Sequence, residues 1–135
     1  MAKRLKAPYF DAYFAVGARA RVPARFAVVT ACDPFGKTAP RAVNRRRDAA
    51  LRRALRSLKI THFRVTGGSR DGAHREPGWG LIVKSPEAAR ALAERFEQDA
   101  YFWISSGRIY LGSAAGGPLA RAGSWNARRA SWGAQ

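Results

Sequence analysis

The sequence predicts an α+β domain with a ferredoxin-like βαββαβ core, in which an antiparallel sheet carries two helices on one face, plus extra strands at both ends. Two observations support this fold class. Two segments repeat apolar residues at helical spacing, and short runs of β-branched and aromatic residues surround them in the required order. The length of 135 residues suits one domain, which we expect to span residues 1–112.

Strands are expected where residues with high β propensity cluster between turn-forming residues. The first run, YFDAYFAV, is rich in aromatic residues, and the second, RFAVVTAC, is almost wholly apolar and suits a central strand. Between the third and fourth runs, residues 67–78 are polar and glycine-rich and predict a loop. The expected strands are residues 9–16, 25–32, 61–66, 78–84, 101–104 and 108–111.

Two helices are expected from apolar periodicity. In residues 41–58, Leu51, Leu55 and Leu58 fall at i, i+4 and i+7 and predict one buried face, while arginines cover the rest of the surface. The second helix is expected to start at Ser85-Pro86-Glu87, because serine caps helices and proline is tolerated at the first position. It runs to about residue 97, with Ala89, Leu92 and Phe96 facing the core.

The last segment has a different composition. Residues 113–135 contain mainly Gly, Ala, Ser and Arg, together with Trp125 and Trp132, and show no periodicity. This pattern predicts a flexible basic tail. A protein-interaction module whose tail docks on a partner is therefore one of the functional hypotheses.

Positive charge is concentrated in the first half of the chain. The formal net charge is +16, and residues 1–60 hold 15 basic but only 3 acidic residues. Because a clustered positive field attracts polyanions, we predict a nucleic-acid-associated module with RNA or a ribonucleoprotein as the expected partner. The alternative is that the arginines reflect the coding bias of a GC-rich genome. The expected contacts lie on the first helix: Arg41, Arg45, Arg46, Arg52, Arg53 and Arg56.

Other features restrict the compartment and the cofactors. No stretch approaches the roughly 20 apolar residues that span a bilayer, and the basic N-terminus lacks the apolar run of a secretory signal. A single cysteine cannot form an internal disulfide, which makes the cytoplasm the expected compartment. The two histidines and Cys32 lack zinc-type spacing, and the glycines at 67–72 precede a strand rather than a helix. We therefore expect no metal and no cofactor.

Several short motifs occur together in a family-like order. They are Thr30-Ala31-Cys32-Asp33-Pro34, then Asn44 and Leu51, then Glu76-Pro77-Gly78-Trp79, then Phe96-Glu97-Gln98-Asp99-Ala100. Over about residues 9–112 the chain resembles the bacterial family called domain of unknown function 3293. It departs from the family pattern at Asp33, where asparagine is usual, and at Gly78, where serine is usual. The resemblance implies no activity, but it implies a set of polar positions: Thr30, Asp33, Asn44, Glu76 and Gln98.

These positions raise a second hypothesis, an enzyme or small-molecule binder with a polar pocket, and whether the protein is an enzyme stays open. Asn44 shares a helix face with Leu51, so its amide either contacts a ligand or holds the Asp33 loop. Glu76 is either a base or cation ligand, or the partner of a nearby arginine. Cys32 is expected to be a small buried residue rather than a nucleophile activated by His62 or His74. Phe102 and Trp103 point to opposite faces of a strand, and only one of them could stack on a base.

Overall fold

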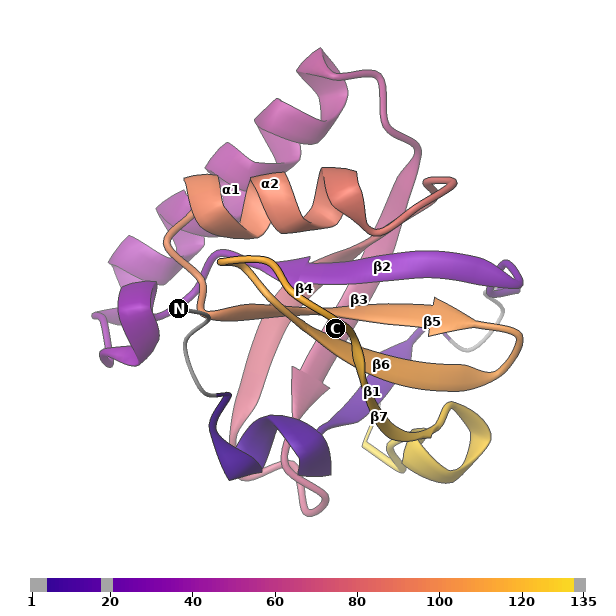
Figure 1. Ribbon diagram of the computed structural model, residues 1–135. Coiled ribbons are helices and arrows are strands. Elements are labelled where there is room, and N and C mark those ends of the chain that lie inside the picture. The colour runs from indigo at the N-terminus through magenta and orange to yellow at the C-terminus, as the bar shows by residue number, and fades with distance from the viewer. Residues whose placement is uncertain (1–4, 18–20, 133–135) are drawn as a thin grey trace.

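The computed structural model describes residues 5–17 and 21–132 and contains one antiparallel sheet of seven strands (Figure 1). The strand order is β1-β3-β4-β2-β5-β6-β7. β2 is the central strand and pairs with β4 on one side and with β5 on the other. The strands are β1 (Tyr13–Val16), β2 (Arg25–Thr30), β3 (His62–Gly68), β4 (Arg75–Leu81), β5 (Ala100–Ser105), β6 (Arg108–Ser113) and β7 (Ala120–Ser124).

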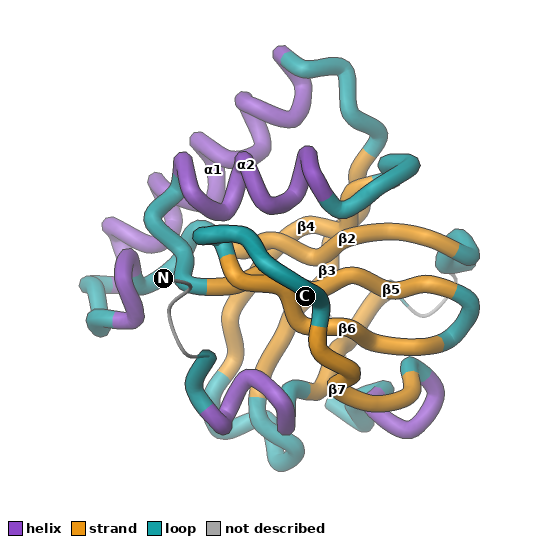
Figure 2. Tube along the Cα trace, viewed as in Figure 1, coloured by secondary structure: helices purple, strands orange, loops and turns teal. Residues whose placement is uncertain are grey.

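Two α-helices accompany the sheet, and both form where the periodicity predicts them. They are α1 (Arg41–Ser57) and α2 (Glu87–Arg95), and they lie side by side on one side of the sheet (Figure 2). In the described part of the chain, neither helix is long and apolar enough to cross a membrane. Short 3₁₀ turns complete the fold: η1 (Ala7–Asp11), η2 (Pro34–Gly36) and η3 (Asn126–Arg128).

The prediction of a ferredoxin-like core is wrong. The seven strands form a continuous sheet that curls into a half barrel, rather than a βαββαβ sheet with terminal strands added to it. The reason lies in how the inner face is buried. Phe14 of β1 stacks on Trp125, which follows β7, with ring centroids 5.5 Å apart. Strands at the two ends of the sheet thus share one core, which requires the sheet to curl.

Alternation along β2 divides the apolar residues between two cores. Ala27 and Val29 face outward and pack with the buried faces of α1 and α2, whose contacts include Leu51, Leu55 and Leu92. Phe26 and Val28 face inward and pack with a second cluster. The inner cluster consists of Phe14, Val16, Phe26, Val28, Val65, Ile104, Ile109 and Trp125.

The segment expected to be a flexible tail contributes to the sheet instead. β6 extends past the expected boundary at residue 112, and β7 pairs with it. Beyond β7, Arg129 bridges to Phe14, and the Ala130 N–H donates to the Phe14 carbonyl. Trp132 is buried, and its indole N–H donates to the Ser69 carbonyl over 3.1 Å. The two tryptophans therefore contact this chain itself, while residues 133–135 lie outside the described part.

Some element boundaries also differ from those expected. Residues 9–11, predicted to begin the first strand, belong to η1, where Pro8 occupies an early helical position. Residues 67–68 and 75–78, predicted to be loop, extend β3 and β4 as a paired hairpin. The connecting loop is consequently only residues 69–74, and it places His74 close to the sheet.

Candidate ligand pocket

A cavity of about 940 Å³ opens on the inner face of the curled sheet, on the side opposite the helices. Its apolar surface comes from Val28 and from aromatic side chains of β1, β5 and η1. Its polar surface comes from the ends of β2, β4 and α2, together with the 69–74 loop. Among the lining residues are Tyr9, Tyr13, Phe14, Phe102, Thr30, Asp33, His74, Glu76 and Gln98.

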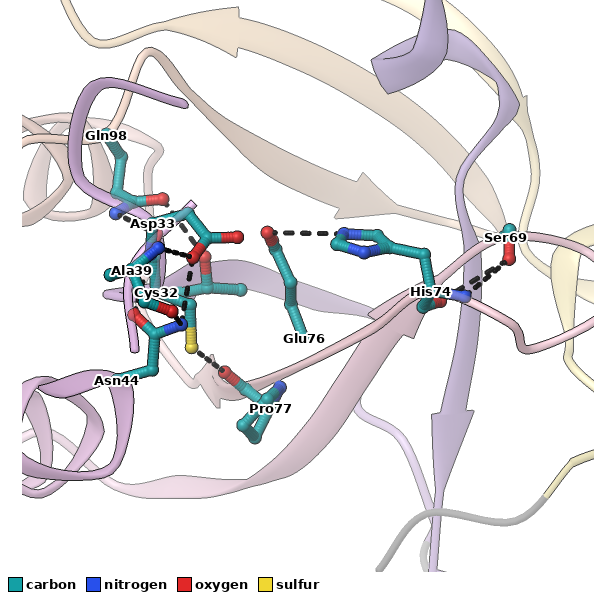
Figure 3. A network of polar contacts seen from close by, with 10 residues as sticks. Cys32, Asp33, Ala39, Asn44, Ser69, His74, Glu76, Pro77 and Gln98 are labelled. Atoms are coloured by element: carbon teal, nitrogen blue, oxygen red, sulfur yellow. Dashed lines mark hydrogen bonds and ion pairs between the residues drawn. The ribbon is translucent and has the colours of Figure 1, made fainter. Parts of the chain in front are cut away.

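Asp33 is held in place by an unusually complete set of contacts. Its backbone has a left-handed conformation, with φ of 49°, which asparagine and aspartate adopt more readily than most residues. Asn44 of α1 accepts from the Asp33 N–H at 2.9 Å and donates to Asp33 Oδ1 at 2.8 Å. The Ala39 N–H also donates to Oδ1, at 2.9 Å. Figure 3 shows the other carboxylate oxygen directed away from Asn44 and toward Glu76.

A second set of hydrogen bonds joins β2 to the end of α2. The Thr30 hydroxyl donates to Gln98 Oε1 at 3.0 Å, and Gln98 Nε2 donates to the Cys32 carbonyl at 2.9 Å. Arg47 strengthens this junction, because its guanidinium donates to the Ala31 and Phe96 carbonyls. The side chains at this end of the cavity are therefore supported by rigid elements rather than by free loops.

Glu76 lies beside Asp33 and approaches His74, with 3.4 Å between His74 Nε2 and Glu76 Oε1 (Figure 3). Burial raises the pKa of Glu76, and the neighbouring Asp33 charge raises it further against the opposing effect of His74. Partial burial of Asp33 acts in the same sense, but the hydrogen bonds from Ala39 and Asn44 outweigh it and lower the pKa of Asp33. Two adjacent carboxyl groups thus have pKa values shifted in opposite directions.

The structure brings together the polar positions that the family resemblance implied. Thr30, Asp33, Glu76 and Gln98 line the cavity, whereas Asn44 stands behind Asp33 and is not part of the lining. These contacts agree with the alternative in which the Asn44 amide holds the Asp33 loop. The cavity adjoins the 33–37 loop and the 67–78 segment, whereas α1 does not line it.

Several lining residues were not recognised from the sequence. Tyr9 is in η1, well before the first polar motif, and Phe102 of β5, considered above only for stacking on a base, follows the last motif closely. His74 was considered above as a possible activator of Cys32, yet its ring approaches Glu76. His74 and Glu76 are two positions apart in an extended segment, and such residues point to the same side of the chain. This spacing is the local signal that could have paired them.

The remaining candidates differ in their position relative to the cavity. Cys32 is among the lining residues, but its side chain is buried, and burial, followed by the Glu76 charge, raises the pKa of its thiol to about 12, which disfavours the thiolate that a nucleophile needs. His62 contacts Trp79 edge to face at 5.2 Å, in the outer core rather than beside Cys32. The helix arginines named above are all exposed on α1. Within residues 5–17 and 21–132, no three His, Cys, Asp or Glu side chains are grouped to hold a metal ion.

Gly78, one of the two departures from the family pattern, has a local packing reason. A Cβ placed on it would lie 2.7 Å from Thr30 Cγ2 and 2.7 Å from the Val29 carbonyl oxygen. Because Thr30 is anchored to Gln98, the close approach of β2 and β4 at this point requires glycine.

The comparisons agree with the motif pattern. The family model described as Protein of unknown function (DUF3293) matches residues 29–101, more than half of the chain, and the chain belongs to this family. The match extends from the end of β2 to the start of β5 and contains all five polar positions. No curated protein and no solved structure matches the chain.

Proposed function

We propose that this member of the DUF3293 family binds a small molecule in the inner cavity, and that Asp33 and Glu76 exchange a proton with it. One observation carries the proposal: two carboxyl groups lie side by side at the cavity, with pKa values moved in opposite directions. Paired carboxyl groups of this kind commonly divide the roles of acid and base between them. A concave, partly apolar site with a few convergent polar groups is also the usual form of a small-molecule site.

The contacts favour a definite division of roles. Asp33 is anchored by Asn44 and the Ala39 N–H, so it remains charged and presents its second oxygen as an acceptor. Glu76 retains its proton to a higher pH than an ordinary glutamate, so it is the natural proton donor. His74, whose side chain is 64% exposed, links Glu76 to solvent and offers a path for returning the proton.

The test is a screen of a small-molecule library against ¹⁵N-labelled protein, followed by titration of the hits into Glu76→Gln and Asp33→Asn. We expect hits to shift the amides of residues that line the cavity and to bind at least about tenfold more weakly to Glu76→Gln, a loss of about 1.4 kcal/mol. Glu87→Gln is the matched control, since Glu87 pairs with Arg90 on α2 and does not line the cavity. Hits that map outside the cavity, or bind both variants like the wild type, would overturn the proposal.

A second candidate is nucleic-acid binding by α1, and a separate observation favours it. The described acidic residue of α1, Asp48, is neutralised by Arg64 at 2.9 Å. The six exposed arginines, Arg41, Arg45, Arg46, Arg52, Arg53 and Arg56, form no ion pair with any described residue. They therefore leave a field of positive charge on the outer surface, which suits phosphate contacts.

The salt dependence of binding tests this candidate. Each phosphate contact adds close to one unit to the slope of log K against log salt concentration. Replacing Arg45, Arg46, Arg52 and Arg53 with glutamine should therefore reduce the slope by about three to four units for a structured RNA. Arg108→Gln and Arg121→Gln, at exposed positions of β6 and β7, are the controls. An unchanged slope in the helix variant would exclude α1 as the contact surface.

A further inference from the structure

We infer that the ligand of the inner cavity is an organic cation, an amine attached to an aromatic or aliphatic body. The inference rests on the proposed function, since it assigns a chemical class to the ligand of the same cavity. Three features carry it: the acidic composition of the cavity lining, the lack of an ion pair between the carboxyl pair and any described arginine or lysine, and the apolar surface that adjoins the pair.

The cavity collects negative charge in a strongly basic chain. Among the described residues that line it are four of the chain's nine acidic residues, Asp11, Asp33, Glu76 and Asp99. Only three of its 25 basic residues, Lys6, Arg70 and Arg128, are among them. A chain with a net charge of +16 thus places its acids preferentially at this site. This composition suits a positive ligand better than an anion, since the hydrogen bonds to Asp33 keep at least that carboxylate charged.

The fold neutralises several other carboxylates with arginine but not the pair in the cavity. Arg64 binds Asp48, Arg90 binds Glu87 and Glu94, and Arg47 contacts Glu97. In the described part of the chain, Asp33 and Glu76 form no ion pair with arginine or lysine, and their polar partners are an amide, a backbone N–H, an imidazole and each other. A cationic group of a ligand can therefore pair with Asp33 and Glu76 without displacing a described arginine.

The donor requirements favour an amine over a metal ion. A hard cation such as Ca²⁺ takes six or more oxygen ligands, whereas the described residues group no three metal-binding side chains. An ammonium has three N–H donors and no acceptor. Oxygens of the Asp33 and Glu76 carboxyl groups and the nearby Tyr9 hydroxyl can accept them.

The rest of the cavity suits an apolar body. Val28, Phe14 and Phe102 line it next to the polar end, and Phe14 and Phe102 meet edge to face at 4.9 Å. Of the three basic lining residues, Arg128 already lies over the Tyr13 ring, 5.4 Å from its centroid. Aromatic rings also attract ammonium groups directly. A ring or chain attached to the amine would therefore replace water on this apolar surface.

The experiment uses three probes that share a phenylethyl group and differ in charge: phenethylamine, 2-phenylethanol and 3-phenylpropanoate. Each is titrated into ¹⁵N-labelled full-length protein at pH 7.5, and amide shifts locate the site. We expect the amine to bind at least about tenfold more tightly than the alcohol, and the carboxylate to bind most weakly. Glu76→Gln and Asp11→Asn should each weaken the amine several-fold, while Glu87→Gln should not. Asp11 is exposed in η1, so its replacement leaves the fold intact.

The outcomes separate this inference from the proposed function. If the alcohol or the carboxylate binds the cavity as tightly as the amine, the ligand class is wrong while the pocket remains a binding site. If the amine shifts amides around Glu87 and Glu94 instead of the cavity, the inference is overturned, because the attraction is then a general surface effect. Failure of all three probes to bind also overturns it, whereas the proposed function is decided by the library screen.

Discussion

Asn44→Ala is expected to destabilise the protein by about 2–3 kcal/mol, although Asn44 touches no ligand. The change removes the 2.8 Å bond to the Asp33 carboxylate and the 2.9 Å bond from the Asp33 N–H. A hydrogen bond to a charged group contributes about 1.5–3 kcal/mol and a neutral one about 1 kcal/mol. The higher helix propensity of alanine recovers roughly 0.5 kcal/mol of this loss.

Urea unfolding at pH 7 measures the loss, with Asn126→Ala as the matched control. Asn126 is exposed at the start of η3, so its replacement should change the free energy of unfolding by no more than about 0.5 kcal/mol. Equal effects of the two variants would refute the assignment of Asn44 as the support of Asp33.

The same pair of proteins has a defined pH dependence. The pKa of Asp33 is lowered in the folded state, so its stabilisation is present above the unfolded pKa and is lost as the pH falls through the folded value. Since Asn44 donates to the charged form, the stability gap between wild type and Asn44→Ala should be largest above about pH 4. It should narrow at lower pH, and a gap that widens on acidification would contradict the proposed hydrogen bond.

Two further predictions concern the outer core and Cys32. Leu55→Ala should lower the free energy of unfolding by about 2–5 kcal/mol, because Leu55 is fully buried. Leu58→Ala, at a position 53% exposed, should lower it far less. Equal losses would mean that the buried face of α1 is misassigned. Cys32 should react with a thiol reagent at pH 8 only after unfolding, because it is buried and its thiol pKa is about 12; rapid labelling of the native protein would show that the site is open.

Local patterns predicted the helices and the polar site well. The spacing of Leu51 and Leu55 gives the buried face of α1, because helical periodicity is a property of a short segment. Asp33, Glu76 and Gln98 could be grouped because each lies at or near the end of a strand or helix, and element ends converge at one edge of a sheet. Their grouping needed no knowledge of the curl.

The curl itself could not be predicted, because it depends on contacts between the two ends of the chain. Neither Phe14 nor Trp125 belongs to a periodic pattern that reveals its partner. The order of helices and strands along the chain does not predict how strongly the sheet curves. Trp125 also follows a segment of Gly, Ala and Arg, which resembles a linker in composition. The contribution of Tyr9 to the cavity wall was missed for the same reason, since η1 is far in sequence from the polar residues, whereas Phe102 follows Gln98 closely and pairs with Val28 of β2.

Trp125 therefore provides the decisive test of the half barrel. Its side chain is 4% exposed, stacks on Phe14 and meets Phe26 edge to face at 5.1 Å. Trp125→Ala should cost about 3–5 kcal/mol in urea unfolding, the usual range for a buried aromatic residue. Trp125→Phe should retain most of that stability, because the buried indole N–H has no hydrogen-bond partner among the residues that the structure describes.

The two Trp125 variants also distinguish closure of the sheet from the flexible tail that the composition predicts. If residues 113–135 were a flexible tail that does not pack on the inner face of the sheet, both substitutions would change the free energy of unfolding by no more than about 0.5 kcal/mol. A closed half barrel makes alanine costly and phenylalanine mild. In a closed half barrel, substitution of Trp125 should also affect the cavity, because Phe14 both contacts Trp125 and lines the cavity. Amide shifts at Val28 and Phe102 in Trp125→Phe would report that coupling directly, and their absence would show that the wall is held without Trp125.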